Sequence, residues 1–275
     1  MTIQKTLHAG TAHSPDSVDD QTRNSLQARI DAMGPWFYDI DLPGGLKTRS
    51  KVNETHAGIH STRRSMLENV LSAHFGTRLS RINAIDLGCH EGYFSFVLRS
   101  LGIPEVLGID LREDNLSRAR LLSDLSDVAG LNFQSANCED LDQVVETRFD
   151  LTLMFGFLYH QENPIRCLRQ AAKITKELLI IETQVVDEIK ASAEWGRKDC
   201  VLPYDGHFAL IDETEFGDNI ELGATALALC PSPDALKAIL RHLGFSRFET
   251  LRCPTGGNEQ LERGKRIVVV ALRDA

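Results

Sequence analysis

Residues 82–92 read Ile-Asn-Ala-Ile-Asp-Leu-Gly-Cys-His-Glu-Gly. The apolar start of this stretch predicts a buried strand, and the residues that follow, 91–102, predict a helix. A glycine turn between a strand and a helix lets the backbone approach a ligand, and the helix N-terminus favours negative groups. The stretch therefore predicts a ligand-binding loop.

Strand-like and helix-like segments alternate outward from this loop. Strands are predicted at 82–88, 105–110, 131–136, 149–155 and 176–183, and helices at 91–102, 114–130, 163–175 and 234–244. Two more strands, 245–252 and 265–272, end the chain and are expected to be neighbours. Apolar strands alternating with helices predict an α/β fold, a doubly wound, mostly parallel seven-stranded sheet with helices on both faces.

Two regions fall outside this alternation. Residues 1–80 predict an N-terminal extension with a polar start, through about residue 16, and helices at 17–33 and 61–75, the second between a Ser61 cap and a Gly76 stop. The remaining residues, 81–275, form the main domain, in which residues 184–230 predict an insertion over the carboxyl edge of the sheet. The aromatic cluster Trp36-Phe37-Tyr38 is either a flap packed on the main domain or a lid over a ligand.

Composition narrows the function classes. The 275 residues include 30 Lys and Arg against 39 Asp and Glu, a net charge of −9, which argues against a broad phosphate-binding face. No apolar run approaches the roughly 20 residues of a membrane helix, and no signal peptide is visible. The six cysteines form no C-x-x-C pair, so we expect reduced thiols, no metal site and a cytoplasmic protein.

Asp110 ends the second predicted strand, 24 residues after Asp86. An acid there can accept hydrogen bonds from both ribose hydroxyls of an adenosine cofactor. The glycine spacing is G-x-x-x-G rather than the dinucleotide pattern, bulky Tyr93 and Phe94 follow, and no phosphate-binding P-loop is present. A nucleoside cofactor without phosphates, S-adenosylmethionine (SAM), fits better.

Taken together, D-x-G-x-x-x-G, the acid ending strand two and Asn137-Cys138-Glu139-Asp140 resemble class I SAM-dependent methyltransferases, over roughly residues 82–183 and 232–272. The resemblance places the methionine part of SAM beside Gly88 and Gly92, its amino end near Asp86, its ribose on Asp110, and its adenine near Asn137 and Cys138. His90 stands where the family often has a third glycine, and implies a contact to the SAM carboxylate or to the acceptor. Phe155 opens the segment that faces the methyl group in such folds.

Three segments resemble a narrower branch, the bacterial enzymes that modify the 5-oxygen of wobble uridine in tRNA. They are CHEGYFSF (89–96), FGFLYHQENPIRCLRQ (155–170) and LLIIET (178–183). Gly34-Pro35-Trp36 and Lys265-Arg266 also match that branch. Its carboxymethyl-transferring members carry a lysine before the Gly-Pro, where this chain has Met33. The substitution favours ordinary SAM over carboxy-SAM, because a cofactor carboxylate would lose a cationic partner that Lys47 or Lys51 would have to replace.

Tyr159 and His160 follow the fourth predicted strand and are the candidate catalytic residues. Methyl transfer to oxygen or nitrogen needs alignment and often a base, and His160 has a suitable pKa. The alternative is a structural histidine that bonds backbone at a turn. The family match favours Tyr159 as a hydroxyl that orients the acceptor, and candidate acceptor contacts are Trp36, Tyr38 and Arg266, although Arg266 would equally pair with a surface acid.

Two further clusters have simpler interpretations. Arg63-Arg64, with Lys47, Arg49 and Lys51, is expected to be a solvated face rather than a grip on an acceptor phosphate or carboxylate. His56 and His60 lack an identifiable third metal ligand, so no metal is proposed there.

Three functions remain open. The first is a methyltransferase acting on O or N of a small polar metabolite, favoured by the acidic charge and the two enclosing segments. The second is a tRNA wobble-uridine methyltransferase or carboxymethyltransferase. The third is a non-catalytic SAM-binding regulatory protein. A homo-oligomer is compatible with all three.

Overall fold

The computed structural model describes residues 20–51, 54–190, 192–194, 201–216 and 225–273. The chain divides into two compact units, Met1–Lys51 and Val52–Ala275. The helix predicted at 61–75 therefore belongs to the second unit rather than to the N-terminal extension. The polar start and Cys200 lie outside the described residues, whereas the other five cysteines are free thiols in this structure.

The first unit contains the helix α1 (Asp20–Ala32) and the short 3-10 helix η1 (Pro43–Gly45). After a cis peptide bond between Gly34 and Pro35, the chain doubles back, and Trp36 bridges Ser50. The Thr48 hydroxyl donates to the Tyr38 carbonyl at 2.5 Å and accepts from the Ile40 amide at 2.8 Å. A buried threonine thus ties the two arms of this aromatic segment together.

The second unit is built on a seven-stranded sheet in the order β10-β11-β5-β4-β1-β2-β3. Its strands are β1 (Asn83–Leu87), β2 (Glu105–Asp110), β3 (Leu131–Ser135), β4 (Phe149–Phe155), β5 (Thr175–Gln184), β10 (Arg247–Thr250) and β11 (Arg266–Leu272). The first five are parallel, whereas β11 runs antiparallel to β5 and β10 antiparallel to β11. The predicted fold, including the pairing of the last two strands, is confirmed.

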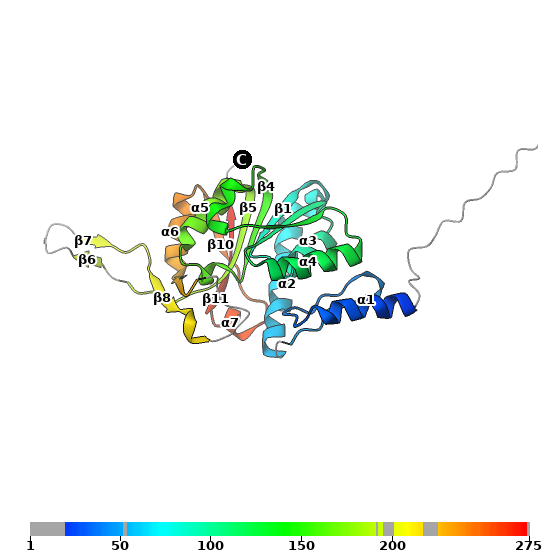
Figure 1. Cartoon of the computed structure of the whole chain (residues 1–275). Helices are drawn as coiled ribbons and strands as arrows, with labels where there is room; N and C mark the ends of the chain where they lie inside the picture. The colour runs from blue at the N-terminus through cyan, green and yellow to red at the C-terminus, as the bar shows by residue number, and fades with distance from the viewer. Residues whose placement is uncertain (1–19, 52–53, 191, 195–200, 217–224, 274–275) are drawn as a thin grey trace, which may run out of the picture. The chain divides into compact units, whose positions relative to one another are not determined.

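Helices cover both faces of this sheet (Figure 1). They are α2 (Glu54–Phe75), α3 (Tyr93–Ser100), α4 (Glu113–Ser126), α5 (Pro164–Ile174), α6 (Pro233–His242) and the short α7 (Glu259–Glu262). One buried cluster joins the sheet to α2 and α3, and a second joins it to α5 and α6. The central strands are largely apolar because both of their faces are covered.

Two helix ends in the described residues differ from the sequence prediction by more than two residues. Helix α2 begins at Glu54, so Ser61 is not its N-cap but an internal residue whose hydroxyl donates to the Gly58 carbonyl. The predicted stop is confirmed, because Gly76 (φ +50°) follows the last residue of α2. Helix α4 ends at Ser126 with Asp127 in the left-handed conformation, rather than at Gly130.

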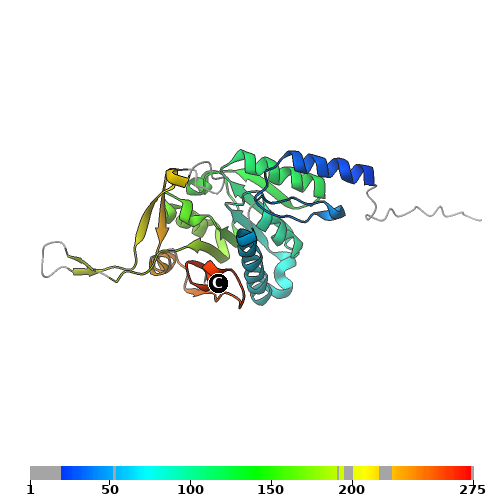
Figure 2. The same ribbon diagram turned by 90° about the horizontal axis from the view of Figure 1, so that it is seen from below.

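The insertion between β5 and α6 forms two small antiparallel ladders, β6 (Ser192–Glu194) with β7 (Val201–Pro203) and β8 (Phe208–Asp212) with β9 (Leu227–Pro231). The β6–β7 pair lies away from the sheet in both views (Figures 1 and 2). The β8–β9 pair returns to it, because the Leu229 amide donates to the Gln161 carbonyl just beyond β4. Part of the insertion is thus held close to the carboxyl edge.

Candidate active site

The strand order reverses at β1. Strands β2 and β3 are added on one side of β1, and β4 and β5 on the other, so β1 and β4 lie side by side. Ligands of open α/β sheets bind at the carboxyl ends of the strands beside such a switch point. Every predicted site residue of the second unit lies at or near this edge. Arg266 is there too, because β11 is antiparallel and its first residue pairs with Gln184, the last of β5.

The loop after β1 requires unusual backbone angles. Gly88, His90 and Gly92 all have positive φ, of 72°, 53° and 85°. A Cβ on Gly88 would lie 2.6 Å from the Phe157 ring, so only glycine fits there. His90 occupies a left-handed position that glycine adopts most easily, which explains structurally why a glycine is common at that place.

Asp110 organises this loop from the end of β2. Its Oδ2 accepts from the His90 amide and its Oδ1 from the Arg112 amide, both at 2.9 Å. Burial raises the pKa of this carboxyl, while those amide contacts oppose the rise. The Asn115 side-chain amide also donates to Oδ1, at 3.4 Å, so of the about four acceptor positions of a carboxylate Asp110 keeps about one for a ligand hydroxyl.

Asp86 lies inside β1 and is almost fully buried. Burial raises its pKa to about 7, although the Ser95 hydroxyl donates to Oδ2 at 2.6 Å and favours the charged form. The Coulombic effect of Asp110 adds to the rise. A cation bound in the loop would lower the pKa of Asp86 and favour its charged form.

The remaining cofactor candidates lie around β3 and β4. The Asn137 side chain accepts from the Glu139 amide at 3.0 Å and caps the 3-10 helix η3 (Cys138–Gln143). Cys138 is buried at the start of that helix. Phe155, the last residue of β4, packs edge-on against Phe94 with ring centroids 4.9 Å apart. Its ring is therefore part of the buried cluster on the α3 face.

Tyr159 joins a buried ion-pair network. It lies in the 3-10 helix η4 (Leu158–His160), and its hydroxyl is 2.9 Å from Arg266 Nη2. Arg266 Nη1 lies 3.2 Å from Glu182 Oε1, and Arg63 Nη2 lies 2.7 Å from Glu182 Oε2. Two guanidinium groups thus share one carboxylate, with side-chain exposures of 4% (Arg63), 0% (Glu182) and 9% (Arg266).

This network corrects two sequence expectations. Arg63 is not part of a solvated face: it reaches Glu182 beneath Gly156, where a Cβ would lie 3.3 Å from the guanidinium. Its neighbour Arg64 is exposed as predicted and pairs with Glu68 at 2.7 Å, and Lys47, Arg49 and Lys51 are exposed as well. Arg266 pairs with a buried acid rather than a surface one.

The His160 ring also contacts a buried acid. Its Nδ1 lies 2.5 Å from Oε1 of Glu213, at the start of the 3-10 helix η5 (Glu213–Phe216). Both side chains are largely buried, with exposures of 15% and 6%. The His160 ring also lies 4.0 Å from the Tyr159 ring, centroid to centroid. Tyr159, His160 and Arg266 therefore form one polar group.

Sequence reasoning missed two of the acids in this group. Glu182 carried a usable signal, because an acid inside the apolar run LLIIET must find a buried cation. Glu213 carried none, since it lies 53 residues from His160 in a segment without clear periodicity.

The aromatic candidates belong to the first unit. Trp36 and Tyr38 are buried, and the Trp36 indole N–H donates to the Ile30 carbonyl at 2.9 Å. Their roles as acceptor contacts stay predictions. Of the two histidines considered for a metal, His60 is buried near Tyr93. In the described part of the chain, no group of three or more metal-ligating side chains occurs.

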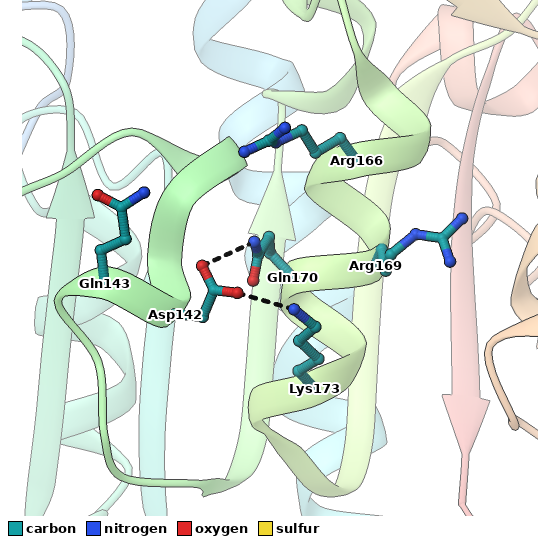
Figure 3. A pocket seen from close by; sticks show the side chains of 6 residues that line it. All are labelled: Asp142, Gln143, Arg166, Arg169, Gln170 and Lys173. Carbon is teal, nitrogen blue, oxygen red and sulfur yellow. Dashed lines mark hydrogen bonds and ion pairs between the residues drawn. The ribbon is translucent and has the colours of Figure 1, made fainter.

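A separate pocket of about 640 Å³ lies between η3 and α5 (Figure 3). Its lining is basic, but Lys173 pairs with Asp142 at 2.8 Å and Arg166 with Asp140 at 2.5 Å. Gln170 donates to the other oxygen of Asp142 at 3.0 Å. Arg166 and Lys173 therefore clamp η3 to α5 and are compensated by acids, which leaves Arg169 as the lining cation available to a phosphate.

The fold and site define a class I methyltransferase. The methyltransferase-domain family model matches residues 79–236, more than half of the chain, and the chain belongs to that family. It is a SAM-dependent methyltransferase. No described helix is both long enough and apolar enough to cross a membrane.

Three comparisons show the range of its relatives. The chain is 24% identical to tRNA U34 carboxymethyltransferase of Cellvibrio japonicus (strain Ueda107), over 90% of this chain and 68% of the relative. It is 30% identical to ubiquinone biosynthesis O-methyltransferase of Neisseria meningitidis serogroup A / serotype 4A (strain DSM 15465 / Z2491), over 34% of this chain and only 39% of the relative. The N-terminal domain of EvdMO1, crystallised in the presence of SAH and D-fucose, has the same fold, with a TM-score of 0.67, 20% identity, and coverage of 92% of this chain and 97% of that one.

Proposed function

We propose that this enzyme methylates an oxygen or a nitrogen of a small polar metabolite. The observation that carries the proposal is a polar cluster at the carboxyl edge of the sheet, in which Tyr159 contacts both Arg266 and His160, and His160 contacts Glu213. The cluster supplies a hydroxyl, a base and a cation at the sheet edge where class I folds bind their ligands.

The residues of the loop fit SAM as the methyl donor. In this proposal the Asp110 carboxylate accepts the ribose hydroxyls, and the turn at Gly88 and Gly92 accommodates the methionine part. Asp86 lies behind that turn, where a cationic amino group would stabilise its charged form. Asn137 and Cys138 bracket the adenine from the end of β3. When bound, SAM supplies an activated methyl group.

The residues of this chain then position the acceptor and take its proton. Tyr159 and Arg266 orient a polar group of the acceptor, and His160 removes the proton that methylation of a hydroxyl or amine releases. Burial of the Arg266 network keeps Tyr159 in a fixed orientation. Two similar proteins, the ubiquinone biosynthesis O-methyltransferase and the EvdMO1 domain crystallised in the presence of D-fucose, are consistent with a hydroxylated acceptor.

Variants of the two candidate catalytic residues test the proposal. In an assay of methyl transfer from labelled SAM to small metabolites, His160→Ala should lower turnover by about 100-fold or more, as for loss of a general base. Tyr159→Phe should lower it by roughly 3–10-fold, the value of one hydrogen bond. SAM affinity should stay unchanged in both.

Exposed residues of the same types serve as controls. His242→Ala, at an exposed position in the last turn of α6, and Tyr204→Phe, at a residue that is 49% exposed, should leave turnover unchanged. Full activity of His160→Ala on an identified acceptor would contradict the assignment of the base.

A second candidate, modification of wobble uridine in tRNA, rests on the similarity to the Cellvibrio relative over 90% of this chain. The net charge of −9 and the compensated groove between η3 and α5 weigh against it. Binding of tRNA that weakens steeply with salt would support this candidate, because released counterions drive such binding. Absence of binding at low salt would exclude it.

A further inference from the structure

We infer that Glu213, supplied by the insertion after β5, is the positioning residue that sets the tautomer of His160. The inference rests on the proposed role of His160 as a base. Glu213 Oε1 lies 2.5 Å from His160 Nδ1, and the Glu213 side chain is only 6% exposed. The contact joins residues 53 positions apart, from η5 and η4.

The backbone brings this carboxylate to the histidine through the β8–β9 ladder. The Glu213 amide donates to the Ala226 carbonyl at 2.8 Å, which ties the start of η5 to the chain just before β9. Strand β9 in turn donates from Leu229 to the Gln161 carbonyl, directly after η4, at 2.9 Å. Glu213 and the residue that follows His160 are therefore both tied to residues 226–229, at the start of β9.

The contact determines which ring nitrogen can act as a base. A carboxylate only accepts hydrogen bonds, so Nδ1 carries the proton and Nε2 carries the lone pair. In the transfer step the acceptor's oxygen or nitrogen forms the new bond to the methyl carbon, and the methyl–sulfur bond breaks with its electron pair returning to sulfur. Nε2 takes the acceptor's proton, and Glu213 stabilises the imidazolium that results.

A second His–Glu pair in this unit provides an internal comparison. His74 Nε2 lies 2.8 Å from Glu177 Oε1, so the same argument assigns the proton to the opposite nitrogen of that ring. Glu177 also binds Arg78 at 2.7 Å. It lies near the first residue of β5, at the opposite end of that strand from Glu182. The two histidines should therefore show opposite tautomers in one protein.

Nitrogen-15 NMR of the full chain with labelled histidine tests the inference without any acceptor. His160→Ala and His74→Ala assign the two signals. In the unmodified protein His160 should be protonated on Nδ1 and His74 on Nε2. In Glu213→Gln the His160 tautomer should become mixed, because an amide both donates and accepts. The matched control, Glu177→Gln, should alter His74 and leave His160 unchanged.

Either an Nε2-protonated His160 in the unmodified protein or an unchanged His160 tautomer in Glu213→Gln would overturn the inference. With an acceptor in hand, Glu213→Gln should lower kcat by about tenfold or more, a part of what a general base contributes. The KM for SAM should not change; a rise in the KM for SAM with kcat unchanged would overturn the positioning role. Absence of methyl transfer by the unmodified protein would refute the proposed function and leave the NMR assignment standing.

Discussion

Asp110 links the loop after β1 to the residue that precedes α4. Its two carboxylate oxygens accept hydrogen bonds from the backbone amides of His90 and Arg112. The sequence was sufficient to place it, because an acid at the end of the second parallel strand has a fixed position in this fold. It was not sufficient to show that the same carboxylate holds His90 in its left-handed conformation. That depends on a contact across 20 residues.

Replacement of Asp110 by alanine should weaken SAM binding. We expect a loss of about 1–3 kcal/mol, because a charge-assisted partner of the ribose disappears. Calorimetric titration with SAM measures the change. Asp114→Ala, an exposed acid in the first turn of α4, is the matched control and should bind SAM normally. Unaltered affinity of Asp110→Ala would show that the ribose lies elsewhere.

Asp86 should make stability depend on pH. Its folded pKa, about 7, is above the ordinary value of 3.8, so the folded state binds the proton more tightly than the unfolded state. The contribution of Asp86 to stability is therefore fully present below about pH 4 and is lost as the pH rises through about 7. Asp86→Asn keeps a neutral side chain of the same shape and lacks this dependence.

Denaturant unfolding of both proteins without SAM between pH 4 and 8 provides the measurement. The stability of the unmodified protein should fall relative to Asp86→Asn as the pH rises through this range. Parallel pH profiles would show that Asp86 titrates normally in the folded protein.

At the scale of elements, the periodicity of apolar residues predicted the strands and the helices after β1 with small boundary shifts. The start of α2 was missed because Ser61 resembles a cap, while the polar residues before it carry no apolar stripe. The β8–β9 ladder was missed because residues 184–230 mix glycine, acids and short apolar runs. Its strands are defined by pairing with each other and with η4, which local sequence does not encode.

Helix α2 and strand β5 are joined by the Arg63–Glu182 ion pair, and its loss should destabilise the fold. Arg63→Met should cost about 3 kcal/mol of unfolding free energy, because it leaves a fully buried carboxylate with one cation fewer. Arg64→Met removes the adjacent but exposed pair with Glu68, and should cost less than about 1 kcal/mol. Chemical denaturation compares the two variants. Equal costs would contradict the assignment of Arg63 to the buried network.

At the scale of the whole molecule, the strand order brings the candidate site residues to one edge of the sheet. The switch between β1 and β4 brings the loop at Gly88 and the cluster at Tyr159 to one edge, and the antiparallel β11 adds Arg266. Alternation of strands and helices was enough to predict this edge. The polar cluster proposed to meet the acceptor is harder to predict from the sequence, because it depends on long-range pairs such as His160 with Glu213 of the insertion.

Incubation of the protein with methyl-labelled SAM and a cell extract, followed by separation of small metabolites from tRNA, tests the central claim most directly. We predict label in the small-metabolite fraction, with transfer abolished in His160→Ala and retained in His242→Ala. Label found only in tRNA, or no transfer to any fraction by protein that binds SAM, would contradict a methyltransferase of small polar metabolites.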